Sequence, residues 1–311
     1  TAGQSITSGA ANTVIGYESG KALTTGGSNI SLGYQAHLAL VSGDNNVAIG
    51  VNAADAMAVG ESENIAIGTS ALGGMDEGTA GGDIDGNIAI GHAALVGGDL
   101  AGNDRQVQDN IAIGRNSLNS TSDNAQTGTI AIGKDALTAL TSGAGNTAIG
   151  YLAMATSTVN HSNVAIGYAA MRYSNGSESQ NVAIGYEAGT SMDNNDSSKS
   201  ILIGYRAGKG GTGEIDRCVV IGDGAMDGTG AVGAQQNIFI GNDAGGGTWT
   251  TAASNSNVAI GATAMSAALN GALGNTALGH DTLKALTSGD NNVAVGSGAG
   301  DALTTGYSNV L

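Results

Sequence analysis

The sequence is poor in the residues that support most globular folds. It has no proline, one cysteine (Cys218), one tryptophan, one phenylalanine and only 10 lysine and arginine residues among 311. A single cysteine excludes a disulfide framework within one chain. Few basic residues argue against nucleic acid and anionic membrane surfaces as partners, because binding phosphates requires clustered Lys or Arg. No apolar run of about 18 residues occurs, so direct membrane insertion is not expected.

The chain has many apolar residues, but many of them have small side chains. Apolar residues make up 41% of the chain and aromatic residues only 3%, and much of the apolar share is alanine. Small side chains cannot fill a wide interior at native packing density. The composition therefore predicts a thin core, and the net charge of −16 fits a chain that stays soluble in a salty or calcium-rich medium.

A short repeat dominates the chain. Asn is followed by Val, Ile or Thr, then Ala, Ile and Gly, as in Asn46 to Gly50 and Asn163 to Gly167. The closing glycine recurs 16 times, mostly at intervals of 17 to 20 residues and twice at 23, at positions 16, 33, 50, 68, 91, 114, 133, 150, 167, 185, 204, 222, 241, 261, 279 and 296. A period of this size indicates a solenoid.

The alternation inside the repeat predicts a strand with two unlike faces. The residue before the glycine is Ile in 13 copies, and a β-branched residue stands two places earlier in every copy. We expect these two columns to point into the coil. The residue between them is Ala in 11 copies and must point the other way. We expect this Ala column to form a flat outer face that another chain or layer covers.

The Asn column predicts hydrogen-bonded ladders between coils. It holds 13 Asn, with Thr129, Ser200 and Cys218 as substitutes. Stacked Asn side chains can bond from one strand to the next. Cys218 is then a small filler in this column, and a reactive thiol is the alternative.

The second leg of each coil is less clear. Ala commonly follows three residues after the glycine, and Thr-Ser-Gly or Thr-Thr-Gly often ends the repeat. Spacing of apolar residues by three allows a short helical turn, but Ala56 to Gly60 looks like a second copy of the strand motif. We favour a strand. The absence of proline fits ladder pairing throughout.

These features predict an all-β fold, a parallel β-solenoid of about 16 coils with 17 to 23 residues per coil, associated into a homo-oligomeric fibre. We expect residues 1–311 to form one continuous array that is a fragment of a longer chain, because both ends interrupt the repeat.

Strings such as Asn46-Val47-Ala48-Ile49-Gly50 resemble the head repeats of trimeric autotransporter adhesins, and the longer period resembles arrays in phage tail fibres and large bacterial surface proteins. The resemblance covers the whole chain. It implies a parallel β-roll, association into trimers and a place outside the cell, on the cell surface or on a virion. Autotransporter heads have a shorter period, so cross-section and handedness do not carry over.

No catalytic constellation is found, so we expect no enzyme activity and no organic cofactor. The four His residues occupy different repeat columns. Calcium is the possible metal, because it prefers several oxygen ligands. Its weak candidates lie in Asp- and Asn-rich turns, where these residues are also ordinary turn formers; they are Asp44, Asp83, Asp85, Asp193, Asp196 and Asp290.

Aromatic residues supply the candidate contact surface. Tyr follows the closing glycine in six coils, and neighbouring coils would stack these rings into a stripe that binds glycan or stiffens the coil. The residues are Tyr17, Tyr34, Tyr151, Tyr168, Tyr186 and Tyr205. Trp249 lies in the stretch 245–256, which we expect to be a surface loop, and the two 23-residue coils predict further loops at 73–86 and 96–109.

The sequence therefore predicts a structural and adhesive extracellular fibre segment that spaces and presents binding regions. The alternative is a glycan- or surface-binding solenoid module that acts through the tyrosines and long loops.

Overall fold

The computed structural model describes residues 1–76, 83–98, 106–121, 125–193 and 197–311. These residues contain strands and turns and no helix. The fold is all-β, a parallel β-solenoid of about 15 turns, as the repeat predicts. Contacts divide the chain into two compact units, Thr1–Val159 and Asn160–Leu311. The candidate stretches at 73–86 and 96–109 lie partly outside the described residues.

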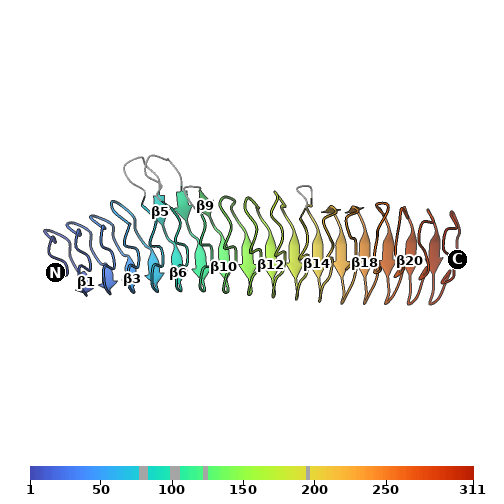
Figure 1. The fold of residues 1–311 in the computed structure, drawn as a ribbon, viewed down its shortest axis with the longest axis horizontal. Coiled ribbons are helices and arrows are strands. Elements are labelled where there is room, and N and C mark those ends of the chain that lie inside the picture. Colours follow the sequence, from blue (N-terminus) through green and yellow to red (C-terminus); the bar gives the residue numbers. More distant parts are fainter. Residues whose placement is uncertain (77–82, 99–105, 122–124, 194–196) are drawn as a thin grey trace. The chain divides into compact units, whose positions relative to one another are not determined.

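The first unit contains one parallel sheet in which each coil contributes one three-residue strand (Figure 1). Its strands, in order, are β1 (Thr13–Ile15), β2 (Ile30–Leu32), β3 (Val47–Ile49), β4 (Ile65–Ile67), β6 (Ile88–Ile90), β8 (Ile111–Ile113), β10 (Ile130–Ile132) and β11 (Thr147–Ile149). A second, three-stranded sheet lies on the other leg, formed by β5 (Asp83–Asp85), β7 (Gln106–Gln108) and β9 (Gln126–Thr127).

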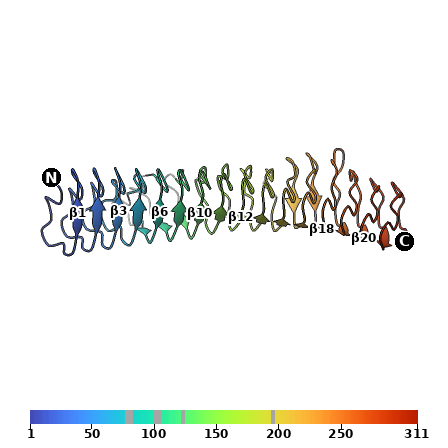
Figure 2. The same ribbon diagram turned by 90° about the horizontal axis from the view of Figure 1, so that it is seen from below.

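The second unit repeats this arrangement, and Figure 2 shows its strands side by side from another direction. Its main strands are β12 (Val164–Ile166), β13 (Val182–Ile184), β14 (Ile201–Ile203), β16 (Val219–Ile221), β18 (Ile238–Ile240), β19 (Val258–Ile260), β20 (Thr276–Leu278) and β21 (Val293–Val295). A two-stranded sheet on the other leg pairs β15 (Ile215–Asp216) with β17 (Ala234–Gln235).

The strand faces the opposite way from our prediction. The middle residue of every main strand after β1, such as Ala66 or Ala183, is buried inside the coil, and its neighbours on either side are exposed or half-exposed. The predicted inward Ile and Val columns and outward Ala column were therefore wrong. The physical reason is the width of the coil: Ala leaves room for the second leg to approach, whereas two columns of Ile would hold it away.

The predicted Asn ladder is confirmed. The Asn46 Oδ1 atom accepts from the backbone N–H of Asn64 at 3.0 Å, and the Asn64 Oδ1 atom accepts from that of Asn87 at 3.0 Å. The Asn64 Nδ2 donates to the carbonyl of Ile84 at 2.7 Å. Each buried amide thus joins its coil to the coils on both sides and also to the second leg, so its polar atoms are satisfied without water.

The closing glycine is required by the backbone and by the stacking. Gly50 has a φ of +140°, where an L-residue is strained. A Cβ added to Gly50 would lie 2.6 Å from the carbonyl oxygen of Gly68 in the next coil. The glycines of neighbouring coils therefore pack backbone against backbone, and no larger residue fits.

The stretch directly after the glycine forms turns in the described residues, with no helix. The strand that we favoured for the second leg occurs further along it and only in some coils, as β5, β7, β9, β15 and β17. Residues two and four places after the glycine are left-handed, as at Leu118 (φ 47°) and Met154 (φ 48°). The Ala56 to Gly60 segment forms no strand. An L-residue in this conformation costs about 1–2 kcal/mol. The left-handed turn nevertheless points the side chain inward, where Leu118 and Met154 are fully buried.

The core lies between the two legs. It consists of the Ala column, the left-handed Leu and Met column and a further Leu or Met of the second leg, such as Leu40 and Met57. The thin core predicted from composition is therefore confirmed, and it leaves larger apolar residues for the outer face of the strands.

Candidate functional site

The outer face of the main strands is an apolar ladder. We define the outer ladder as the first and third residues of every main strand, which are Val, Ile, Leu or Thr. In the strands that the structure describes, no charged residue occupies these positions. Its most exposed members are Ile15, Ile30, Leu32, Ile201, Ile238, Ile260, Leu278, Val293 and Val295.

The rungs of the outer ladder are in register. Ile65 pairs with Ile88, Ile88 with Ile111 and Ile111 with Ile130. Parallel in-register pairing repeats the same shape at about 4.8 Å. Large contiguous apolar surfaces are uncommon on proteins that act as monomers. The outer ladder is therefore a candidate contact surface. The sequence did not reveal it, because we expected the Ile and Val columns inside the coil and the Ala column outside.

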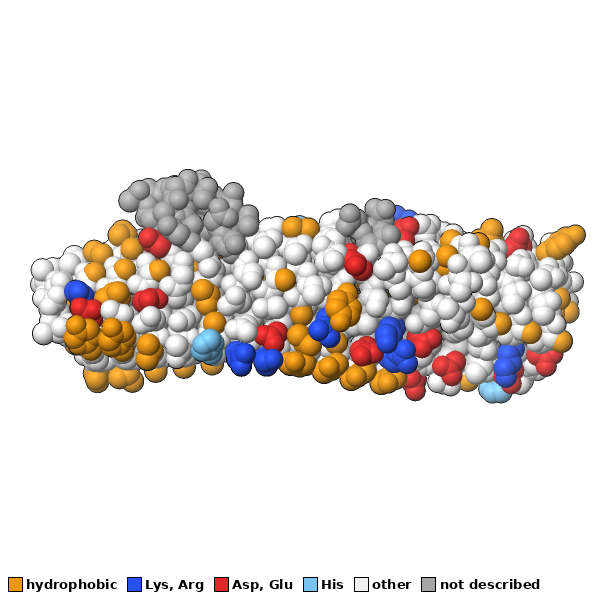
Figure 3. Space-filling view, in the orientation of Figure 1, with side chains coloured by type: hydrophobic (Ala, Val, Ile, Leu, Met, Phe, Trp, Pro, Cys, Tyr) orange, Lys and Arg blue, Asp and Glu red, His pale blue; other side chains and the backbone are white. Residues whose placement is uncertain are grey.

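The tyrosines form the predicted stripe beside this ladder. Tyr17 stacks on Tyr34 at 5.5 Å between ring centroids, and Tyr186 stacks on Tyr168 and Tyr205 at 4.9 and 5.2 Å. Their side chains are exposed, as the prediction requires. Figure 3 shows hydrophobic side chains along the rim where the strand arrows of Figure 1 end.

The stacking decides what the tyrosines can offer. The rings lie within 12° of parallel, so neighbouring rings cover each other's faces. A sugar ring packs best on an open aromatic face, and Tyr186, which has a stacked ring on each side, presents only its edge and hydroxyl group. Lys134 also lies over the Tyr151 ring at 4.9 Å. The geometry therefore favours stiffening of the coil over sugar stacking.

The aspartates that were candidates for calcium mainly bond to the neighbouring coil. The carboxylate of Asp44 accepts from the backbone N–H of Gly27 at 2.6 Å, and that of Asp290 accepts from Leu273 at 2.9 Å. Asp85 accepts from Ser62 in the same way at 2.6 Å.

Two further candidates lie on the second leg. The Asp83 carboxylate accepts from the Gln108 side chain at 3.2 Å, and the backbone N–H of Asp193 donates to the carbonyl of Ser191. Asp196 lies outside the described residues. In the part of the chain that the structure describes, no three His, Cys, Asp or Glu residues gather as a metal site would require. Calcium binding stays a prediction.

Trp249 is not a surface contact, so this prediction was wrong. Its side chain is 1% exposed and meets the ring of Phe239 edge to face, with centroids 6.1 Å apart. Phe239 occupies the Ala column of its strand. The two large rings fill one coil together, which places the only tryptophan in the core instead of at a loop tip.

Cys218 and His37 are structural. The Cys218 thiol lies in the Asn column and donates to the carbonyl of Ala234 at 3.2 Å, and burial raises its pKa to about 11. His37 bonds to the Ser31 hydroxyl at 2.7 Å, and burial lowers its pKa to about 4. These contacts support the filler interpretation of Cys218, because a thiol with a raised pKa is a poor nucleophile at neutral pH.

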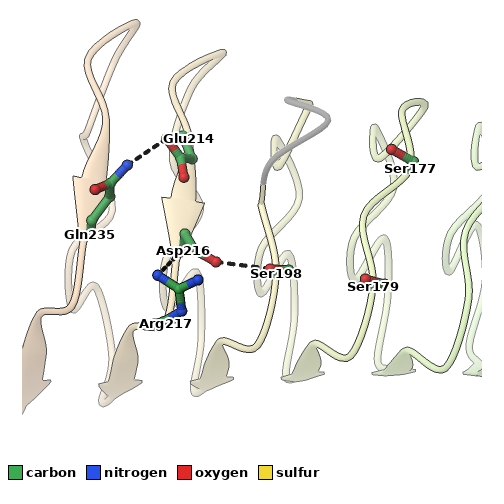
Figure 4. A pocket seen from close by; sticks show the side chains of 7 residues that line it. All are labelled: Ser177, Ser179, Ser198, Glu214, Asp216, Arg217 and Gln235. Carbon is green, nitrogen blue, oxygen red and sulfur yellow. Dashed lines mark hydrogen bonds and ion pairs between the residues drawn. The ribbon is translucent and has the colours of Figure 1, made fainter.

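A polar groove crosses the second leg of the second unit (Figure 4). It has a volume of about 370 Å³ and is lined by Ser177, Ser179, Ser198, Glu214, Asp216, Arg217 and Gln235. Asp216 is buried and accepts from the Ser198 hydroxyl at 2.8 Å, and Arg217 pairs with it at 3.0 Å. The Gln235 amide donates to Glu214 at 2.7 Å.

A buried glutamate lies between two serines that line this groove. Glu178 stands between Ser177 and Ser179 and points into the core. Burial raises its pKa to about 7, and the nearby Asp193 carboxylate adds to this effect. The column that holds it, three places before the Asn column, holds Gly, Ile, Ala or Ser in most coils. A carboxyl group here is unusual because the surroundings disfavour its charged form.

Comparison with known proteins assigns no family to the chain. No protein-family model, curated protein or solved structure matched it. In the described residues, no helix is long and apolar enough to span a membrane.

Proposed function

We propose that this chain is a structural and adhesive segment of an extracellular fibre, located on a cell surface or a virion, in which chains associate side by side. The observation that carries this proposal is the outer ladder: each unit bears an in-register apolar surface on a solenoid whose own core is already closed by Ala. A closed coil does not need this surface for its own folding, so the surface is available to a partner.

The partner proposed is a further copy of the same chain. Two faces of identical repeat can interlock rung by rung, because both advance by the same strand spacing of about 4.8 Å. Flat sheets with apolar faces pack about 10 Å apart in this way. A trimer is the assembly that the resemblance to autotransporter heads implies, with the outer ladder in place of the Ala column as the contact between chains.

The solenoid suits a mechanical role. Each coil is tied to the next by the Asn ladder, by strand pairing and by the backbone contacts of the glycine column. A stack of this kind transmits load through many parallel bonds and holds other regions at a distance. The alternative, a binding module, is supported by the polar groove more than by the stacked tyrosines.

The test is the mass of the chain in solution, measured by light scattering. A trimer or another closed oligomer is expected. The variant Ile88→Lys/Ile111→Lys places two charges in the middle of the outer ladder and should give a monomer that keeps its strands by circular dichroism.

The matched control is Ser8→Lys/Thr25→Lys, which makes the same change of charge at exposed positions away from the ladder. It should keep the parental mass. A well-folded monomer from the parental chain would contradict the proposed association, and the outer ladder would then be a surface for a ligand.

A further inference from the structure

We propose that the polar groove of the second unit binds a neutral, hydroxyl-rich saccharide that lies along the stack of coils. This inference rests on the adhesive part of the proposed function and gives it a site. The groove is built from residues of four successive coils, which contribute Ser179, Ser198, Asp216 and Gln235 at corresponding positions of the second leg.

The spacing of the groove matches a linear polymer. Ser179 bridges to Ser198, and Asp216 pairs with Gln235, both in parallel register. Neighbouring side chains therefore advance by one strand spacing, about 4.8 Å. This distance is close to the advance of one sugar unit along an extended glycan. A glycan parallel to the stack would thus meet one polar side chain for each sugar.

The groove presents both donors and acceptors, which hydroxyl groups require. Asp216 is held by the Ser198 hydroxyl and by Arg217, so its carboxylate is fixed in place. Arg217 uses one nitrogen for this pair, and its side chain is 56% exposed, which leaves further N–H groups facing solvent. The Gln235 amide is fixed by its bond to Glu214. Figure 4 shows these side chains along one side of the coils.

The charges of the lining argue against other ligands. Glu214 and Asp216 carry two negative charges and Arg217 one positive charge, so the groove would repel phosphate and acidic sugars. A divalent cation is disfavoured because Arg217 already occupies the Asp216 carboxylate. With mostly polar side chains at its surface, the groove also offers little to an apolar ligand. With anionic, cationic and apolar ligands disfavoured, a neutral ligand rich in hydroxyl groups fits this lining best.

The test uses the full chain and three probes, measured by isothermal titration calorimetry and saturation-transfer NMR. Cellohexaose and chitohexaose are neutral linear saccharides, and oligogalacturonate of similar length is the acidic comparison. At least one neutral probe should bind, with oligogalacturonate bound more weakly. Binding of no neutral probe, or preference for the acidic one, would overturn the proposal.

Two variants locate the site. Arg217→Ala should weaken binding about tenfold, the effect of losing a hydrogen bond to a charged donor. Alanine fits the left-handed backbone here, because Ala11 stands at the same repeat position with a φ of 60°. Ser179→Ala should weaken binding by a smaller factor. Arg115→Ala, which removes the same charge from an exposed position in the first unit, should bind as the parent does.

Equal affinity of Arg217→Ala and Arg115→Ala would place binding elsewhere and overturn the assignment. The mass of each sample is measured alongside. If the chain is an oligomer but binds no neutral saccharide, the proposed side-by-side association is supported and the saccharide site is contradicted. If the chain is a monomer that binds a neutral saccharide, the saccharide site is supported and the association is contradicted.

Discussion

At the residue scale, side chains across the coil compensate for one another in size. Phe239 replaces Ala in the strand, and the residue six places later is Gly245, where a Cβ would lie 2.6 Å from the Phe239 ring. Leu202 likewise faces Gly208, whose Cβ would lie 2.6 Å from it. In these two coils, the large side chain of the strand is thus accommodated because a glycine faces it.

This pairing predicts a rescue. Phe239→Ala should destabilise the chain by about 3–5 kcal/mol, because it leaves a cavity. Gly245→Met should also destabilise it, by overpacking against the ring. The double variant recreates the Ala and Met pair of Ala259 and Met265, so it should be more stable than either single variant.

The free energies of unfolding from urea titration measure this cycle. Met265 has a φ of 50°, so a methionine is compatible with the backbone at this position. Additive losses in the double variant would show that the two positions are independent and would contradict size compensation.

The buried Glu178 predicts a dependence of stability on pH. Its pKa is raised from 4.5 to about 7 in the folded chain. Below about pH 4.5 the carboxyl is protonated in both the folded and unfolded states, and this group costs no stability. Between about pH 4.5 and 7 the unfolded chain releases this proton while the folded chain keeps it, so stability falls over this window and the loss is complete above about pH 7.

Glu178→Gln should remove that part of the pH dependence and raise the melting temperature at pH 8 by several degrees. Asp301→Asn, at an exposed position, is the control and should follow the parent. Melting curves between pH 4.5 and 8 that are parallel for the parent and Glu178→Gln would mean that Glu178 has an ordinary pKa.

At the scale of the element, the Asn ladder sets the strength of each coil junction. Asn64 is 1% exposed, and it bonds to the coil before it, the coil after it and the carbonyl of Ile84. Ser200 occupies the same column, accepts from the N–H of Cys218 at 3.0 Å and donates to Ile215 at 3.2 Å. Serine therefore keeps part of the network.

Asn64→Ala should lower the free energy of unfolding by about 2–4 kcal/mol, because it leaves a buried N–H and a buried carbonyl without partners. Asn64→Ser should cost clearly less, because its hydroxyl can meet both groups as Ser200 does. Urea titration of the two variants measures the difference. If serine cost as much as alanine, the ladder would owe its stability to packing instead of hydrogen bonds.

At the scale of the whole molecule, charge opposes the association that the outer ladder favours. The net charge is −16 on 311 residues, so copies of the chain repel one another at long range. Salt screens this repulsion, with a Debye length of about 30 Å at 0.01 M and about 8 Å at 0.15 M. An apolar contact is not weakened by the same change.

The proposed assembly should therefore tighten with salt. Sedimentation equilibrium in 0.01 M and 0.15 M NaCl should give a dissociation constant that falls as salt increases. An assembly that loosens with salt would rest on ion pairs between chains, and the outer ladder would not be its main contact.

The amino-acid sequence is sufficient to establish the repeat and the stacking of its coils. A period of 17 to 23 residues with a β-branched strand predicts stacked parallel coils, and a small polar column predicts the buried ladder of Asn46, Asn64 and Asn87. Stacking of Tyr17 on Tyr34 has the same origin: identical positions in successive coils must be neighbours.

Which face of the strand lies inside depends on the three-dimensional arrangement of the two legs. Alternation shows that Ala66 and Ile67 point to opposite sides, but it does not show which side the second leg covers. In most coils a left-handed Leu or Met of that leg, such as Leu72, fills the space opposite the strand, so a small residue such as Ala66 fits there. The polar groove was equally hidden, because the equivalent positions that Ser179, Ser198, Asp216 and Gln235 occupy in successive coils carry no single residue type that a repeat would reveal.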